Sequence, residues 1–346
     1  MKKRIISILL SSAMILSLAA CGSQGTPASS SATANNSSSS GSDGKPTIEA
    51  LDLLSGAATG SWYTIGAGLA DKFNDNYEGF PMTTIPGPGS IGNIPIIASG
   101  DSEIGMSYGP FLIAAQNGEA PFETAYTNLR AICVLQPTVI QPITTLDIDT
   151  LGEFIDGKMK ESVGVYPVGN ASTFIIETIL KQYGLSGIDA MEEWGAKPYY
   201  ADGSSLADAW ADRHIVLQMP MVNVPASGVT EALVTRSDGH LISLDQEIID
   251  KLVAENGFSS YTIKAGTYEG QTEDCQTVGL PIVVFTTEDV DEEIVYNFTK
   301  SIYENKEYFE GVHSSFAEFD PQTMNEGVAI ELHPGAEKFY KEVGLM

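Results

Sequence analysis

The feature that most constrains the fold of this chain is an alternation of apolar runs with amphipathic segments along residues 47–346. Most of the runs are too apolar to keep one face in water, which indicates strands buried on both faces. Between them, apolar side chains recur at helical spacing, as in 61–75 and 172–183. This alternation predicts α/β layers around a largely parallel sheet, and about 300 residues suffice for two such units. The predicted strands are 47–54, 104–107, 131–135, 163–166, 215–219, 241–244 and 278–285.

Acidic residues mark two further helix starts. Asp245 is predicted to cap a helix that stops at Gly257. Four carboxylates between positions 289 and 293 fall in the first turn of a helix predicted to run through Tyr308. Negative charge at that end favours the positive pole of the helix dipole.

The amino terminus has the pattern of an export signal, residues 1–20. Its basic head, Lys2 to Arg4, precedes a 16-residue apolar stretch, which is short for the ~20 residues of a spanning helix. The stretch ends in Leu-Ala-Ala-Cys, which resembles the lipobox of bacterial lipoproteins, and Cys21 is the predicted lipidation site. The alternative is an ordinary cleaved signal followed by an incidental cysteine.

Residues 21–46 are predicted to be a Ser/Gly-rich tether. Nine serines occur among the 25 residues of 22–46, with no aromatic or branched aliphatic side chain, so the segment cannot bury a core. As a coil it spans roughly 25–30 Å, from about 5–6 Å times the square root of its length.

The charge balance excludes polyanionic partners. Lys and Arg number 18 against 45 Asp and Glu, a net charge of −27, and such a chain repels nucleic acids and anionic lipid surfaces. Cys133 lies in an apolar run and is expected to be a buried thiol, although a disulfide with Cys275 is chemically allowed outside the cell. The four histidines share no ligand-like spacing, so neither a metal nor a cofactor is predicted.

Three strand-to-helix junctions carry the polar residues. In the first, 58–66, small residues let a ligand approach backbone amides, and Trp62 and Tyr63 can form a wall beside Ser61. Adjacent helical residues point about 100° apart, so one of these two aromatic rings is expected to belong to the core. The other ring can then face the ligand.

The second junction, 85–93, contains Gly-x-Gly-x-x-Gly at positions 87, 89 and 92. Pro88 occupies the turn in which a dinucleotide loop needs backbone freedom, so a nucleotide site is not favoured. A glycine-rich turn remains, with Ser90 predicted as the helix N-cap and suited to one anionic group. The third junction, 163–173, has the same form of strand, turn, capping residues and helix.

Catalysis finds little support in the sequence. No Gly-x-Ser-x-Gly or Ser-x-x-Lys pattern surrounds a serine at a strand end, and no histidine falls at a comparable junction. A hydrolase using Ser90 or Ser172 is the alternative. The chain is predicted not to be an enzyme.

Six segments resemble, in order, the TAXI family of TRAP-transporter solute receptors. They are ATGSWYTIG, GPGSIGN followed by ASGDSEIGMS, VGVYPVGNAS, VPASGVTEA, AGTYEGQTED and LHPGAEKFYKEVGL. The resemblance implies an α/β type II periplasmic-binding-protein fold, with two α/β lobes joined by two crossing strands. The crossings are expected near 135–142 and 278–285, which gives lobe one as 47–140 with 278–346 and lobe two as 141–277.

The resemblance also implies a function. The chain would be an extracytoplasmic, lipid-anchored receptor that captures a small organic acid or amino acid, glutamate-like or dicarboxylate-like, between its lobes and delivers it to a TRAP-type membrane permease. The alternative from another class is a ligand-sensing lipoprotein that signals to a membrane kinase.

The family's binding positions, taken together with the third junction, give nine candidate ligand-binding residues in this sequence. Tyr108 stands where the family continues toward a Gln-Ser-Asp element, so an amide contact is replaced by a phenol and a glutamate-type ligand cannot be assumed. The mapped residues are Ser61, Trp62, Tyr63, Ser90, Asn93 and Tyr108 in lobe one, and Asn170, Ser172 and Thr173 in lobe two.

Overall fold

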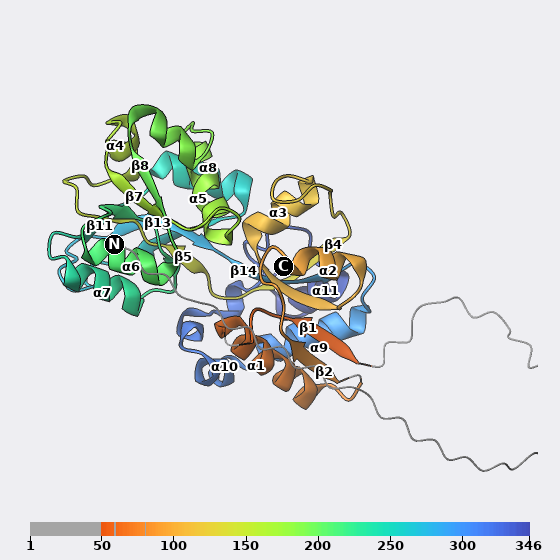
Figure 1. The fold of residues 1–346 in the computed structure, drawn as a ribbon. Helices are drawn as coiled ribbons and strands as arrows, with labels where there is room; N and C mark the ends of the chain where they lie inside the picture. Colours follow the sequence, from red (N-terminus) through yellow and green to blue (C-terminus); the bar gives the residue numbers. More distant parts are fainter. Residues whose placement is uncertain (1–49, 59, 80) are drawn as a thin grey trace, which may run out of the picture. The chain divides into compact units, whose positions relative to one another are not determined.

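The computed structural model describes residues 50–346, apart from 59 and 80 (Figure 1). The predicted export signal, Cys21 and the tether lie outside the described residues. Among those described, no helix is both long and apolar enough to cross a membrane.

The first sheet, sheet A, combines an early and a late part of the chain. Its first three strands run parallel, with β1 between β2 and β3, whereas β14 is antiparallel to both β3 and β4. In spatial order its strands are β2 (Met82–Ile85), β1 (Leu51–Leu54), β3 (Ile104–Tyr108), β14 (Ile282–Thr287) and β4 (Leu129–Val134). The helices before or after these strands are α1 (Ser61–Asn76), α2 (Asn93–Ser99), α3 (Gly109–Asn117), α9 (Glu292–Tyr303), α10 (Lys306–Val312) and α11 (Pro334–Val343), with short 3-10 helices η2 (Ser314–Glu318) and η3 (Pro321–Thr323).

Two further sheets are built from the middle of the chain. Sheet B is antiparallel throughout and contains, in order, β10 (Met221–Val222), β5 (Thr138–Ile140), β13 (Cys275–Leu280) and β12 (Ser259–Ile263). Sheet C contains β11 (His240–Leu241), β6 (Ile143–Thr144), β9 (Leu217–Gln218), β7 (Ser162–Val165) and β8 (Lys197–Tyr200). The helices of this part are α4 (Leu151–Asp156), α5 (Ala171–Gln182), η1 (Ile188–Trp194), α6 (Gly203–Ala211), α7 (Ser227–Thr235) and α8 (Gln246–Asn256).

The chain passes twice between sheet A and sheet B. The first passage leads from β4 through residues 135–137 into β5, and the second from β13 through Pro281 into β14 (Figure 1). The predicted fold of two α/β lobes joined by two crossing strands is therefore confirmed. The lobe limits given above stay predictions.

The expectation of a largely parallel sheet is only partly right. Parallel pairs join β1 to β2 and β3, and β7 to β8 and β9, but the strands that return from a crossing run antiparallel to their neighbours. The expected strand 278–285 is interrupted at Pro281, which has no N–H to donate to a ladder.

Two helix predictions also need correction. The helix expected to run through Tyr308 ends at Tyr303 and resumes at Lys306. Between the two, the backbone of Asn305 leaves the helical region, with φ −124° and ψ 32°. Asp245 does precede α8, but its carboxylate makes no cap there. It accepts hydrogen bonds from the Gly152 N–H in α4 (2.9 Å) and the Tyr183 hydroxyl (2.7 Å).

The strands of sheet A are buried as their sequences predict. All residues of β3 and of β14 are buried, which agrees with strands covered on both faces. Cys133 and Cys275 are buried and free, so the disulfide does not form. Burial raises the pKa of Cys275 to about 11 and also raises that of Cys133.

Candidate functional site

Three predicted site segments meet at one edge of sheet A. Because β1, β2 and β3 are parallel neighbours, their carboxyl ends lie at the same edge. The segment after β1 leads into α1, the segment after β2 leads into α2, and α3 begins directly after β3. The Gly87 N–H donates to the Gly56 carbonyl (3.1 Å), which joins the first two segments.

The start of α1 is open to a ligand. Its N-cap, Gly60, provides no side chain to bond the first amides, and its first turn holds no acidic residue. The first four amides of a helix lack helical acceptors, so this end can receive an anion. Ser61 is exposed. Trp62 and Tyr63 are both half-buried, and Trp62 packs against the larger apolar core, which agrees with one ring of the pair facing inward.

Ser90 lies in the glycine-rich turn but does not cap a helix. The residue before α2 is Gly92, and no side chain caps that helix, so the predicted N-cap at Ser90 is wrong. Instead, the Asn93 N–H donates to the Gly89 carbonyl (2.9 Å) and closes the turn. The side chain of Ser90 is 8 % exposed, and its hydroxyl has no hydrogen-bond partner among the described residues.

Asn93 ties the carboxyl ends of the strands together. It is fully buried, and its amide donates to the carbonyls of Leu54 (3.3 Å), Ser55 (2.8 Å) and Met106 (2.9 Å). Its oxygen accepts from the Gly89 N–H (3.2 Å). These bonds occupy the side chain that the sequence assigned to the ligand.

Tyr108 is nearly buried at the end of β3. Its ring packs edge-on against Trp62, with centroids 5.0 Å apart, and its hydroxyl lies 3.2 Å from the Thr138 hydroxyl. Burial raises the pKa of Tyr108, so the phenol stays neutral near neutral pH. Ser107, which the sequence interpretation did not include, donates to the Ser90 carbonyl at 2.6 Å. Ser107 precedes Tyr108 at the end of a predicted strand, and this position was the sequence signal that could have identified it as a site residue.

The third junction forms the corresponding edge of sheet C. β7 runs parallel to β8 and β9 and leads through a turn into α5. Asn170 caps this helix, since its side chain accepts from the Ser172 N–H (2.8 Å). The Thr173 hydroxyl donates to the carbonyls of Tyr166 (3.0 Å) and Pro167 (2.9 Å). The predicted strand, turn, cap and helix are therefore present.

Ser172 differs from its two neighbours. Its side chain is 9 % exposed, and its hydroxyl has no partner in the part of the chain that the structure describes. The first turn of α5 carries no acidic residue. The next strand, β8, leads into α6, whose N-cap is the Asp202 carboxylate; hydrogen bonds from the Ser205 N–H and the Ser204 hydroxyl hold its pKa below the usual range. Negative charge thus occupies the start of α6 but not that of α5.

The nine predicted residues form two groups, six at the edge of sheet A and three at the edge of sheet C. Within the described residues, no hydrogen bond or ring contact joins one group to the other. No lysine or arginine occurs in 55–61, 86–93, 108–109 or 166–173. An anion at either edge would therefore depend on amides and hydroxyls.

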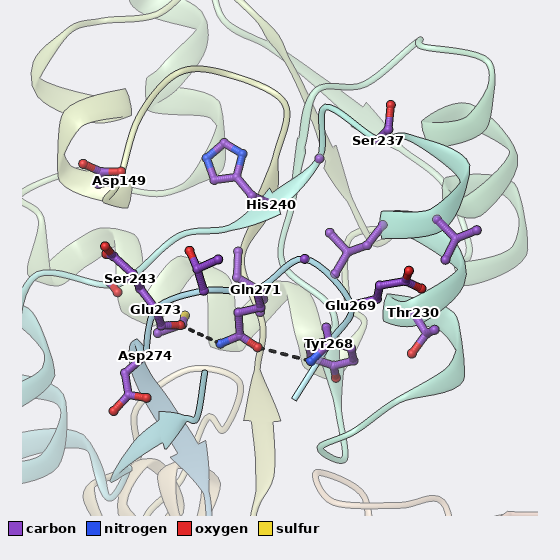
Figure 2. A pocket seen from close by; sticks show the side chains of 17 residues that line it. Asp149, Thr230, Ser237, His240, Ser243, Tyr268, Glu269, Gln271, Glu273 and Asp274 are labelled. Carbon is purple, nitrogen blue, oxygen red and sulfur yellow. Dashed lines mark hydrogen bonds between the residues drawn. The ribbon is translucent and has the colours of Figure 1, made fainter. Parts of the chain in front are cut away.

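A hollow of about 770 Å³ lies elsewhere, beside β11 and the loop before β13, and none of the nine residues lines it (Figure 2). Gln271 closes part of its wall, since its amide donates to the Glu273 carbonyl and its oxygen accepts from the Tyr268 N–H. Four carboxylates line the hollow, with no lysine or arginine among its lining residues, so it does not suit an anion: Asp149, Glu269, Glu273 and Asp274.

Two of the segments that suggested the family meet at Tyr268. Its hydroxyl donates to the side chain of Gln141 (2.5 Å) and accepts from the Ala226 N–H (3.0 Å). VPASGVTEA and AGTYEGQTED are thus joined by a partly buried hydrogen bond. No cluster of three or more potential metal ligands occurs among the described residues.

Comparison with solved structures places this fold among solute-binding proteins. A TctC solute-binding protein from Polaromonas, determined without ligand, matches with a TM-score of 0.53 and 12% identity, over 85% of this chain and 98% of that one. MatC from Rhodopseudomonas palustris with bound malate matches with a TM-score of 0.47 and 11% identity, over 85% and 96%. A TRAP periplasmic solute-binding protein from Rhodobacter sphaeroides matches with a TM-score of 0.41 and 13% identity, over 86% and 90%.

At 12% identity, the match to the TctC protein shows a shared fold. The sequence comparison adds a match that begins in β1 and ends just after α11. It includes both groups of predicted site residues and both crossings. Since the pattern of the NMT1-like family covers residues 53–344, the chain belongs to that family.

Proposed function

We propose that this chain is the extracytoplasmic receptor of a TRAP-type secondary transporter, of the TAXI group, and that it holds one small carboxylate between its lobes. The carboxylate is delivered to an integral membrane permease. The motifs quoted above support the TAXI assignment.

One observation carries the proposal. The start of α1 has no side-chain cap, the start of α5 is capped only by the neutral Asn170, and neither carries an acidic side chain in its first turn. A nearly buried serine hydroxyl without a partner among the described residues occurs at each edge. Amides and hydroxyls at a helix start stabilise a carboxylate, and the helix dipole adds to the attraction. A site of amides and hydroxyls, with no buried lysine or arginine, also keeps release to a permease easy.

The net charge of −27 is compatible with an anionic solute. At a screening length of about 8 Å, most surface carboxylates act only weakly on the site. Lobe closure is then a shift of population toward the state in which both helix starts contact the solute.

A thermal-shift screen of the purified protein tests this function. The panel comprises small organic acids, amino acids and neutral sugars. A solute at 100 times its dissociation constant stabilises the folded state by about 2.7 kcal/mol, which is readily visible as a raised melting temperature. We expect the largest shift from a carboxylate that is recovered unchanged. A neutral sugar as the best hit, or a chemically altered solute, would contradict the proposal.

Membrane attachment through Cys21 is tested separately. Cys21→Ser should yield a protein that is released from the membrane or retains its signal, because stable anchoring by lipid needs two acyl chains and the sequence offers no other membrane element. Cell fractionation measures this. Firm membrane association of the variant with its signal removed would exclude the lipoprotein assignment.

A further inference from the structure

Tyr108 and Gly109 contact both segments through which the chain crosses between sheets A and B. Tyr108 is paired with Ile282 across β3 and β14, and its hydroxyl lies 3.2 Å from Thr138 in β5. The Gly109 N–H donates to the Pro281 carbonyl at 3.1 Å. Two consecutive residues are therefore bonded to the first and the second crossing.

Gly109 also brings the start of α3 against the end of α8. A Cβ atom at Gly109 would lie 2.5 Å from the Gly257 carbonyl oxygen, closer than side chains tolerate. Gly257 ends α8 in the left-handed region, with φ 71°, and a Cβ there would lie 2.8 Å from the Ile113 side chain. The two helices thus meet through backbone, and each glycine is required for a different reason: Gly109 for close approach and Gly257 for its φ.

This backbone contact joins elements of different sheets. α3 follows β3 of sheet A, whereas α8 precedes β12 of sheet B. Besides the crossing segments, the contact between Gly109 and Gly257 therefore joins the part of the fold built on sheet A to the part built on sheets B and C. Because packed interiors transmit strain, a methyl group added at Gly109 would change the spacing between the two helices.

Tyr108 also contacts the start of α1. The ring of Tyr108 packs edge-on against Trp62 at 5.0 Å, in the first turn of that helix. With 8 % of its surface exposed and its hydroxyl near Thr138, Tyr108 has little left to offer a solute. Its contacts instead run from the α1 start to a crossing strand.

We propose that Tyr108 and Gly109 are positioning residues that form the pivot of lobe rotation in solute capture. Gly109 sets the spacing between α3 and α8, and Tyr108 couples the first turn of α1, which carries Trp62, to β5. The proposal rests on the function proposed above, and it reassigns Tyr108 from solute contact to hinge.

Distances between spin labels in the solute-free protein test the pivot. Labels are attached to cysteines introduced at Glu78 and Lys160, which are exposed, in a Cys21→Ser background; Cys133 and Cys275 are buried. In Gly109→Ala the Gly257 oxygen must retreat by at least 0.5 Å to reach 3.0 Å (3.0 − 2.5). A hinge amplifies such a displacement, so the mean label distance should change by about 2 Å or more.

Gly311→Ala is the matched control. Gly311 lies in α10, where an added Cβ would meet nothing within 4 Å, so the distance distribution should equal that of the parent protein. A Gly109→Ala distribution indistinguishable from that of Gly311→Ala would overturn the pivot.

A second pair of variants keeps the proposal testable if Gly109→Ala fails to fold. Tyr108→Phe and Thr138→Val each remove the same hydrogen bond. Both should broaden the distance distribution to the same extent, and the double variant should add nothing further, because the two residues act through one contact. Unchanged distributions, or additive effects, would overturn the coupling. Since no solute is present, this outcome is independent of whether the screen finds a carboxylate.

Discussion

At the scale of single residues, the predicted site side chains differ in whether their bonds are already made. Asn93 and Thr173 bond backbone carbonyls of their own junctions, whereas the hydroxyls of Ser90 and Ser172 have no partner among the described residues. The sequence could place polar residues at strand ends because strand, turn and helix follow local rules. It could not show which side chains are used internally, since those bonds join residues such as 54 and 93 that are far apart in the chain.

The unpaired hydroxyls make a prediction about affinity. Ser90→Ala or Ser172→Ala should weaken binding of the best carboxylate roughly tenfold to a hundredfold, because losing a hydrogen bond to a charged group costs about 1.5–3 kcal/mol. Isothermal titration calorimetry measures the effect. Ser186→Ala is the control, since Ser186 is exposed in the loop after α5. Affinities within a factor of two of the parent for both variants would mean that these turns only connect strand to helix.

Asn93 makes the opposite prediction, with an effect on stability. Asn93→Ala leaves the buried carbonyls of Ser55 and Met106 without this donor, and each unsatisfied group costs about 1–3 kcal/mol. We expect the free energy of unfolding in urea to fall by roughly 2–4 kcal/mol. Asn76→Ala, at the exposed end of α1, should change it by less than about 0.5 kcal/mol. If Asn93→Ala and the parent protein have the same free energy of unfolding, the hydrogen bonds of Asn93 do not stabilise the fold.

At the scale of elements, periodicity predicted the helices better than the strand directions. The segments 61–75 and 172–183 correspond closely to α1 and α5, because their apolar faces repeat at helical spacing. Asp245 was assigned a capping role from its position alone, yet its carboxylate bonds α4, more than ninety residues earlier. A local pattern identifies where a helix begins, but the partner of a side chain depends on packing.

The histidine at the start of α11 leads to a prediction about how stability depends on pH. His333 caps α11: its Nδ1 accepts from the Gly335 N–H (3.1 Å), and Nε2 lies 3.0 Å from the Val290 carbonyl. Burial lowers the pKa of His333 below its usual 6.5, so the unfolded chain binds the proton first as pH falls. Stability should therefore decrease as pH falls from about 7 to about 5, a range above the titration of most carboxylates.

Two variants separate this histidine from the others. His333→Asn retains a capping oxygen and cannot titrate, so unfolding in urea should lose part of its pH dependence between pH 7 and 5. His214→Asn, at an exposed position, should retain it. If both variants keep the slope of the parent, the cap does not titrate as described.

At the scale of the whole molecule, the path of the chain decides which strands run parallel. The two crossings were expected near 135–142 and 278–285, and the chain does pass between sheets A and B at 135–137 and at Pro281. Apolar runs could not predict that β14 enters sheet A between β3 and β4 in the opposite direction. Strand direction is set by where the chain comes from, and burial on both faces looks the same for either direction.

The division of the site between two sheets predicts a change of shape on binding. A solute held at both helix starts should draw the lobes together, so small-angle X-ray scattering should show a smaller radius of gyration with the best carboxylate than without it. At saturating solute, Ser172→Ala should compact less than the parent, because the bound solute loses a contact that stabilises the closed state. Ser186→Ala should compact fully. Full compaction of Ser172→Ala, or none in the parent, would mean that the α5 start does not hold the solute in the closed state.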